Sequence, residues 1–216
     1  EGKKGQRVIF DCHATRVDSR LNAVMEIYSR QENRVRLLTY SRRQLGHDPL
    51  ADVTLPADGE YFVRVFDERF LGAADYGYLL SVHTGPHIDY IMPAAGVPGT
   101  TGSFTLFGRN LPGGQPSGVK FGGRELQKLA VKIAVPKTTH ALHSTSRVEP
   151  VAAGLDSFGY SLATPAGASN AVPIYFTAGT VAVEIEPNDS SEKAQKIKVP
   201  GEIGDRLAAG SEIRVF

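Results

Sequence analysis

The feature that most constrains the fold of this chain is a two-residue alternation of apolar side chains, repeated along the sequence and interrupted by turn residues. Successive side chains of a β-strand point to opposite faces, so each alternating stretch presents one apolar face. The 23 Gly and 13 Pro residues supply turns between such stretches. This pattern predicts an all-β fold of antiparallel β-sandwiches, in which each strand buries one face.

Residues 1–85 are predicted to form the first sandwich. The alternation within residues 21–28 could also be drawn as a helix, but Val35–Tyr40 follows after a short break, and a hairpin accounts for both stretches. Pro56–Gly59 has the composition of a tight turn and leads into a strand at Tyr61–Phe66. A further strand face combines Tyr76, Tyr78, Leu80 and Val82.

After Gly85 and Pro86 the apolar runs become shorter, and clusters of Gly and Pro separate them. Residues 86–180 are therefore predicted to form a second, smaller antiparallel sandwich. Residues 138–147 show no clean period and are predicted to be a loop or an irregular edge. The candidate strands are His87–Ile91, Ser103–Phe107, Val119–Phe121, Leu129–Val135, Phe158–Leu162 and Val172–Phe176.

Residues 181–216 change character again, because acidic and small polar residues open this segment. Asp189 and Glu192 have the spacing of a capping box, which predicts a short helical turn through Ala194. Apolar positions then lead to a last strand at Ile213–Phe216. A chain that stops inside an apolar strand indicates a cut within a domain, so the segment is predicted to open a further domain.

Charge and composition exclude several classes of protein. The 24 Lys and Arg residues nearly balance 23 Asp and Glu residues and are scattered, so no basic stripe for nucleic acid is present. No apolar run reaches about 18 residues, which predicts no membrane span. Cys12 is the one cysteine, which excludes an intramolecular disulfide. It shares a strand face with Val8, Phe10 and Ala14, and we expect it to be a small buried side chain.

A search for catalytic patterns finds little. The sequence holds no Gly-x-Ser-x-Gly elbow, no phosphate-binding loop with its Lys and no His-Glu-x-x-His pair. His140 and His143 could meet on one helical turn, but a solvated loop pair is the commoner case for two imidazoles without further ligands. Asp67 and Glu68 are paired carboxylates beside a turn and are predicted to be solvated. We therefore expect these residues not to form an enzyme.

Two separated portions resemble the bacterial pre-peptidase C-terminal (PPC) domain, a β-sandwich of large secreted proteins that often lies beside proteases. The strings Glu184-x-Glu186-Pro187-Asn188-Asp189 and Gly201-Glu202-Ile203 look like its opening. Leu55–Val65 and Tyr76-x-Tyr78-x-Leu80 look like its body and end. The resemblance implies that residues 1–85 are a PPC-like sandwich lacking its first strand or strands, and that residues 181–216 open such a domain.

The middle portion resembles an immunoglobulin-like domain of the IPT/TIG type. The strings that carry this likeness begin at Ile88-Asp89-Tyr90, Phe104-x-Leu106-x-Gly108 and Val119-Lys120-Phe121. The order of the three portions leaves two explanations open. The chain is an excerpt of a longer array of alternating domains, or residues 183–216 supply missing strands to the N-terminal sandwich of the same or the next molecule.

Oxygen-bearing side chains gather in the third portion, where Glu184, Glu186, Asn188 and Asp189 fall within six residues. Hard cations such as Ca²⁺ prefer oxygen ligands in flexible geometry. The resemblance implies a calcium site here, because the matching stretch holds calcium in some PPC-like collagen-binding domains. Downstream, Gly210-Ser211-Glu212 departs from the Gly-Asp-x-Asp pattern of the family, which removes expected ligands. A capped acidic linker is the alternative.

The function that these observations favour is a non-catalytic extracellular module for adhesion, docking or spacing within a larger secreted or bacterial surface protein. The alternative is the accessory region of a secreted protease or other hydrolase whose catalytic domain lies elsewhere. Expected partners are other domains of the parent protein and an extracellular protein or polysaccharide. Four aromatic side chains could form a binding strip, namely Tyr28, Tyr40, Phe62 and Phe66. Aromatic residues of strands are more often core residues.

Overall fold

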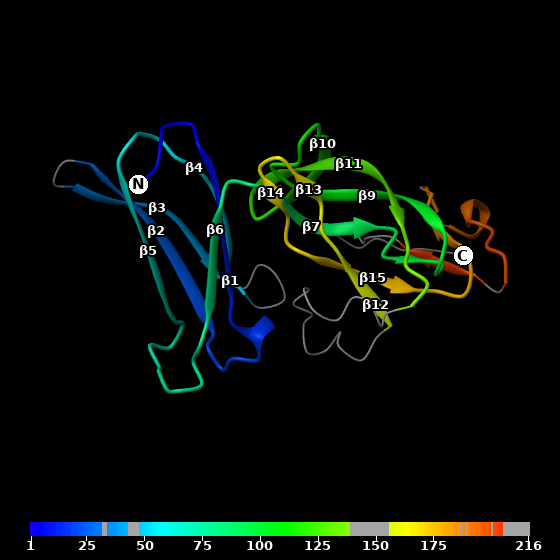
Figure 1. The fold of residues 1–216 in the computed structure, drawn as a ribbon, viewed down its shortest axis with the longest axis horizontal. Coiled ribbons are helices and arrows are strands. Elements are labelled where there is room, and N and C mark those ends of the chain that lie inside the picture. The colour runs from blue at the N-terminus through cyan, green and yellow to red at the C-terminus, as the bar shows by residue number, and fades with distance from the viewer. Residues whose placement is uncertain are drawn as a thin grey trace.

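The computed structural model describes residues 1–31, 34–42, 48–138, 156–185, 187–188, 190–199 and 201–204. In this part of the chain the fold is all-β, with several antiparallel sheets and only short 3₁₀ turns such as Thr15–Val17. Figure 1 shows two sheet-rich units side by side, with the C-terminal segment at the far end of the second. The all-β prediction is therefore confirmed.

The first unit contains six strands in two three-stranded antiparallel sheets. One sheet has the order β4-β1-β6, and the other has the order β3-β2-β5. The strands are β1 (Arg7–His13), β2 (Ala23–Gln31), β3 (Arg34–Arg42), β4 (Leu50–Thr54), β5 (Glu60–Asp67) and β6 (Leu79–His83).

The two sheets of the first unit enclose one hydrophobic core between them. Every second residue of β1 and β2 contributes to this core, as the alternation predicts. On one side the two sheets are joined by a hydrogen bond, which Ser41 Oγ of β3 donates to the Leu50 carbonyl of β4 at 2.7 Å. This arrangement is sandwich-like. The buried members are Val8, Phe10, Cys12, Ala14, Leu21, Ala23, Met25, Ile27, Ala51, Val53 and Leu55.

The second unit is built from a four-stranded antiparallel sheet of order β10-β11-β9-β7 and a three-stranded sheet of order β12-β15-β8. The larger sheet contains β7 (His87–Met92), β9 (Thr101–Arg109), β10 (Gln115–Phe121) and β11 (Arg124–Ala134). The smaller sheet contains β8 (Ala95–Gly96), β12 (Ser157–Tyr160) and β15 (Val172–Phe176). A short hairpin is formed by β13 (Ala163–Thr164) and β14 (Gly167–Ala168).

A separate core fills the second unit, with Ile88, Leu106 and Ile174 almost fully buried at its centre. The described core residues of the two units fall within residues 8–55 and 88–174, respectively. The domain boundaries at residues 85 and 180 stay predictions. One pairing departs from the antiparallel expectation, because β15 runs parallel to β8.

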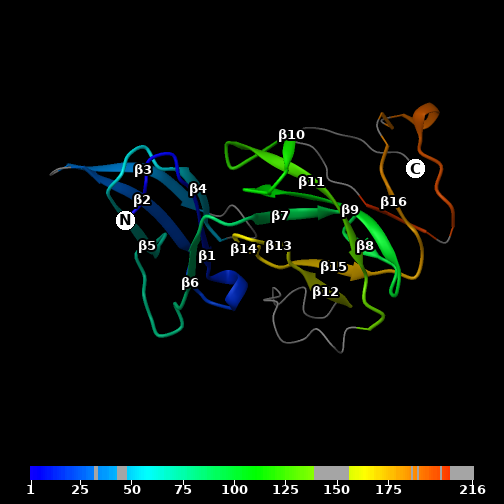
Figure 2. The same ribbon diagram turned by 45° about the horizontal axis from the view of Figure 1, so that its top comes forward.

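The third portion forms a small two-stranded parallel sheet from β16 (Val181–Val183) and β17 (Glu202–Gly204). A 3₁₀ turn at Ser191–Lys193 lies between them, close to the predicted helical turn. Ser190 is its N-cap and makes no side-chain capping bond, while Asp189 lies outside the described residues. Both views place this segment at the end of the molecule opposite the first unit (Figure 2).

The sequence predictions for the longer strands mostly hold, but they lack β4 and the two- and three-residue strands β8, β13, β14, β16 and β17. The hairpin of residues 21–28 and 35–40 is confirmed as β2 and β3. Strand β4 was not predicted, because Leu50–Thr54 lies in a short stretch before the turn at residue 56. The predicted strand at Ile213–Phe216 and most of the predicted loop at residues 138–147 lie outside the described residues.

We predict that Gly108→Ala destabilises the second unit, because a Cβ atom at Gly108 would lie 2.1 Å from the backbone oxygen of His87 on the paired strand β7. Backbone cannot yield as a flexible side chain does, so we expect a loss of about 3 kcal/mol or more in urea unfolding. Gly77→Ala is the matched control, since its Cβ would meet open space. Equal stabilities of the two variants would contradict the close approach of β7 and β9.

Candidate functional site

The candidate binding site is an exposed aromatic face on the outer side of sheet β3-β2-β5. Pairing places Tyr28 opposite both Leu37 and Phe62, and Val24 opposite Phe66, on the side away from the core. The Tyr40 and Phe62 side chains are 46% and 43% exposed. The interpretation of these rings as core residues is therefore wrong. The outer aromatic face consists of Tyr28, Tyr40, Phe62, Phe66 and Phe70.

Phe70 was not among the sequence candidates, and it is the most exposed ring of the face at 74%. It follows the end of β5 in the left-handed conformation, with φ of 57°, and its ring stacks on Phe66 with centroids 5.3 Å apart. A non-Gly residue with positive φ is uncommon and marks a position held by its surroundings. Asp67 supplies that hold, because its carboxylate accepts the Arg69 and Leu71 backbone N–H groups.

Arginine side chains lie among the rings and are each matched by a carboxylate. Arg64 lies over the Phe66 ring, 4.6 Å from the centroid, in a cation–π contact. Its Nη1 atom is 3.4 Å from Glu26, and Tyr28 donates to the same Glu26 carboxylate at 2.7 Å. Arg42 pairs likewise with Glu68 at 2.7 Å. The face thus combines flat apolar rings with both donors and acceptors and carries little net charge.

The second feature of interest is the junction between the two units, where the outer face of sheet β4-β1-β6 of the first unit is covered. Strand β1 is buried on both faces: Val8 and Phe10 face the core, while Ile9 and Asp11 face outward and are also almost fully buried. On β4, the outward side chain of Asp52 is equally buried. Polar residues on this covered face must find partners, because an unpaired buried charge is costly.

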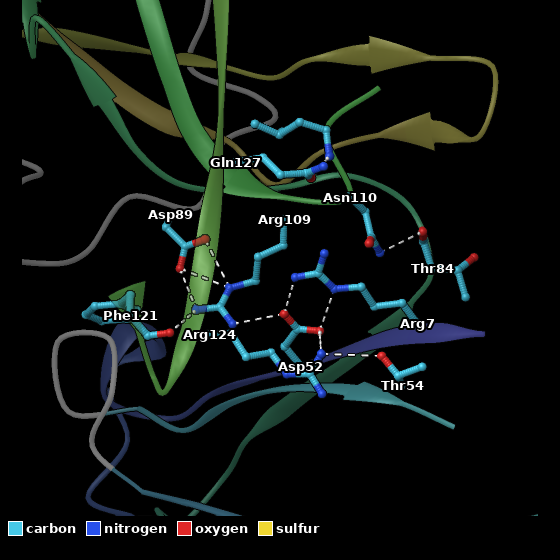
Figure 3. Close-up of polar contacts among 11 residues, drawn as sticks. Arg7, Asp52, Thr54, Thr84, Asp89, Arg109, Asn110, Phe121, Arg124 and Gln127 are labelled. Carbon is cyan, nitrogen blue, oxygen red and sulfur yellow. Dashed lines mark hydrogen bonds and ion pairs between the residues drawn. The ribbon is translucent and has the colours of Figure 1, made fainter. Parts of the chain in front are cut away.

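Arg109 of β9 supplies the partner across the junction (Figure 3). Its Nη1 atom donates to Asp52 of the first unit at 3.2 Å, and its Nε and Nη2 atoms donate to Asp89 of the second at 3.1 Å each. Nη2 also donates to the Phe121 carbonyl at 3.3 Å. Arg7 holds the other side of the Asp52 carboxylate, with Nε 2.8 Å from Oδ1. One buried guanidinium therefore bridges carboxylates of both units.

The two carboxylates respond differently to this environment. Burial opposes ionisation of Asp52, but hydrogen bonds from Arg7 and the charges of Arg7, Arg109 and Arg124 outweigh it and lower its pKa. Burial raises the pKa of Asp89, and Arg109 offsets that effect only in part. Asp52 is therefore the firmly ionised anchor of the junction.

A second buried polar cluster lies at the far end of β1. Asp48 accepts backbone N–H groups of Ala14, Thr15 and Arg16 at 2.7–3.1 Å, and the Arg16 Nε atom donates to it at 3.0 Å. Arg16 also reaches Asp11, whose other oxygen lies 3.0 Å from His13 Nε2. Burial disfavours the Asp11 anion, but the bonds from His13 and Arg16 lower its pKa overall. This cluster fixes the turn after β1.

His87 begins β7 and is fully buried, and the charges of Asp11 and Arg16 from one cluster and of Arg109 from the other act on it. Neither ring nitrogen has a hydrogen-bond partner within the part of the chain that the structure describes. Its ring stacks with His83 at a centroid distance of 6.1 Å. Burial lowers the pKa of His87 to about 4, and Arg109 adds to the effect while Asp11 opposes it. The imidazole is therefore neutral at physiological pH.

A polar cleft of about 310 Å³ opens beside the junction. Arg36, Arg109 and Arg124 line it together with Asp52 and Tyr40, so it meets the outer aromatic face at Tyr40. Elsewhere in the junction, Asn110 Nδ2 donates to the Thr84 carbonyl at 3.1 Å, which ties the residue after β9 of the second unit to the residue after β6.

The predicted calcium ligands are only partly within the described residues. Glu184 and Asn188 are both buried, and Asn188 donates its amide N–H to Glu184 Oε1, whereas Glu186 and Asp189 lie outside the described residues. Among the described residues no group of three or more His, Cys, Asp or Glu side chains could hold a metal ion. Calcium binding stays a prediction from the resemblance. His140 and His143 also lie outside the described residues.

Cys12 has the environment that the alternation predicts. Its side chain is fully buried in the first core, and burial, together with Asp48 and Asp11, raises the pKa of its thiol to about 12. A thiol that stays protonated is a poor nucleophile. The sequence prediction of a small buried residue is confirmed.

Comparison with known proteins adds no assignment: no family model, no curated protein and no solved structure matches the chain. The class that fold and site define is an all-β protein of sandwich-like units. Within the described residues, no helix has the length and apolar character needed to cross a membrane. The likeness to PPC and IPT/TIG domains stays a prediction from the sequence strings.

Removing the bridging guanidinium should loosen the junction. We predict that Arg109→Ala lowers the free energy of unfolding by about 3–5 kcal/mol, because it leaves Asp89 buried without its cation. Arg64→Ala is the control, since the contacts of this exposed side chain with Glu26 and the Phe66 ring lie at the surface, and the change should alter stability by less than about 1 kcal/mol. Both values come from urea unfolding. A loss in Arg109→Ala no larger than in the control would contradict the bridge.

His87 should make stability depend on pH. The unfolded imidazole binds a proton near pH 6.5 and the folded one only near pH 4, so the free energy of unfolding should fall as pH drops from 6.5 to 4, by about 3 kcal/mol. His87→Gln should remove this part of the pH dependence, and His83→Gln should keep it. Urea unfolding at several pH values gives the comparison. Parallel curves for wild type and His87→Gln would overturn the prediction.

Proposed function

We propose that this chain is a non-catalytic extracellular module that docks onto an extended polysaccharide through the outer aromatic face. The observation that carries the proposal is the gathering of partly or well exposed rings on one face of a sheet. Soluble proteins rarely expose large contiguous apolar patches without a binding role. Tyr40, Phe62 and Phe70 offer flat surfaces of the kind against which the C–H face of a sugar ring can stack, a contact driven by burial of apolar area.

The polar groups between the rings support a neutral ligand. Arg42 and Arg64 are balanced by Glu68 and Glu26, so the face offers donors and acceptors to hydroxyl groups without a strong field of one sign. A polyanion would require unpaired cations. An extended chain also matches the geometry of the site, because rows of side chains along a strand repeat every two residues.

The junction suits this role because it fixes the position of the face within a longer assembly. The Arg109 bridge and the Asn110 contact to Thr84 connect the two units by buried or specific bonds. A module with fixed geometry loses less entropy on binding than one with a free hinge. Three further parts of the proposal rest on the sequence resemblance. They are the extracellular or cell-surface location, the other domains of a parent protein as neighbours, and the alternative role as the accessory region of a secreted hydrolase.

The proposal predicts that ring removal weakens polymer binding without unfolding the protein. Phe62→Ala and Tyr40→Ala should each reduce affinity about tenfold, which corresponds to about 1.4 kcal/mol. The measurement is affinity electrophoresis or calorimetry against neutral polysaccharides such as cellulose, xylan and β-glucan fragments, with collagen and other matrix proteins as the comparison set.

Tyr78→Ala is the matched control, because this ring is about as exposed but directly precedes β6, a strand of the other sheet. It should bind as the wild type does. Equal losses in all three variants would contradict a site on the face. Binding of matrix proteins but of no polysaccharide would overturn the ligand class.

A further inference from the structure

The first unit is closed on one side and open on the other. On the closed side β3 and β4 meet, and the buried Ser41–Leu50 bond joins the two sheets. On the other side the sheets end in β5 and β6, and neither of these edges pairs with another strand along its length in the described residues. We call this side the open edge.

Core-facing side chains reach the surface at the open edge. Register places Val82 opposite Phe10 and Val63 opposite Ile27, so both point toward the core. Phe10 and Ile27 are buried, whereas Val82 is 54% exposed and Val63 is only half-buried. Leu80 and Val65 are half-buried in the same way. An added strand with apolar side chains on one face would cover these four residues and satisfy an unpaired backbone edge.

A segment with that pattern lies at the opposite end of the molecule (Figures 1 and 2). Residues 195–199 read Gln-Lys-Ile-Lys-Val and have no helix or strand pairing of their own. Ile197 and Val199 alternate with lysines, and Val199 is 89% exposed. Gln195 anchors the segment, because it accepts the Ile185 backbone N–H at 2.7 Å and donates to the Val183 carbonyl at 3.2 Å.

The two features complement each other in length and spacing. Strand β6 has five residues and presents Leu80 and Val82 two positions apart, while residues 195–199 present Ile197 and Val199 two positions apart. In extended chains both pairs span about 7 Å. Because β6 belongs to the first unit and this segment lies at the far end of the second unit, the two meet most directly between two copies.

We propose that copies of this chain associate head to tail, with residues 195–199 of one copy adding as a strand to the β6 edge of the next. Ile197 and Val199 then cover Leu80 and Val82. A contact between unlike surfaces does not close on itself as a dimer, so it propagates into open chains or rings. This inference is independent of polymer binding, since the outer aromatic face belongs to sheet β3-β2-β5 and the proposed contact uses β6 of the other sheet.

The test is the oligomeric state of the full chain by sedimentation velocity and light scattering across a range of concentrations. The wild type should form dimers and larger species as concentration rises. Val82→Lys removes the acceptor and Val199→Lys removes the donor, so each variant alone should stay monomeric. Both positions are exposed, and unchanged circular dichroism and urea unfolding confirm that each variant folds. Val35→Lys, at an exposed position on β3, is the control and should assemble as the wild type does.

Mixing the two monomeric variants gives the decisive result. Val82→Lys keeps an intact donor and Val199→Lys an intact acceptor, so the mixture should form a one-to-one dimer that grows no further. A wild type that stays monomeric at every concentration would overturn the proposal. So would assembly that survives either variant, or a mixture of the two variants that remains monomeric. Polysaccharide binding by the monomeric variants, measured in parallel, separates failure of this proposal from failure of the proposed function.

Discussion

The buried guanidinium of Arg109 is the interaction on which the rest of the architecture depends. Asp52 and Asp89 lie within hydrogen-bond distance of it, one on each unit, and all three side chains are withdrawn from water. Isolated buried charges cost several kcal/mol each, so these groups are tolerable only together. The two units can therefore separate only by exposing these charges or leaving them without partners.

This constraint assigns distinct roles to the surfaces of the first unit. The outer face of sheet β4-β1-β6 is covered by the junction, where Ile9 and Asp11 are buried. The outer face of sheet β3-β2-β5 remains exposed and carries the rings. The edge between β5 and β6 is neither covered nor paired within the described residues. In the described part of the first unit, this face and this edge are thus open to other molecules.

Several of these features could be predicted from particular residues. Alternation at Leu21, Ala23, Met25 and Ile27 predicts β2 and its buried face, and Cys12 follows from its place in line with Phe10. The sequence also identified the candidate rings, but it did not show on which side of the sheet they lie. The pairing of β2 with β5 has to be known before alternation can place Tyr28 and Phe62 on the face opposite the core residues of their strands.

Sequence by itself determined the all-β class, the hairpin and the two groups of core strands, because these follow from local periodicity and turn chemistry. Only the tertiary structure decided that both faces of β1 are buried, that Arg109 meets a carboxylate 57 positions away, and that the β5–β6 side is open. The physical reason is distance along the chain. Pairing of charges and covering of edges depend on which strands become neighbours, and no local pattern contains that information.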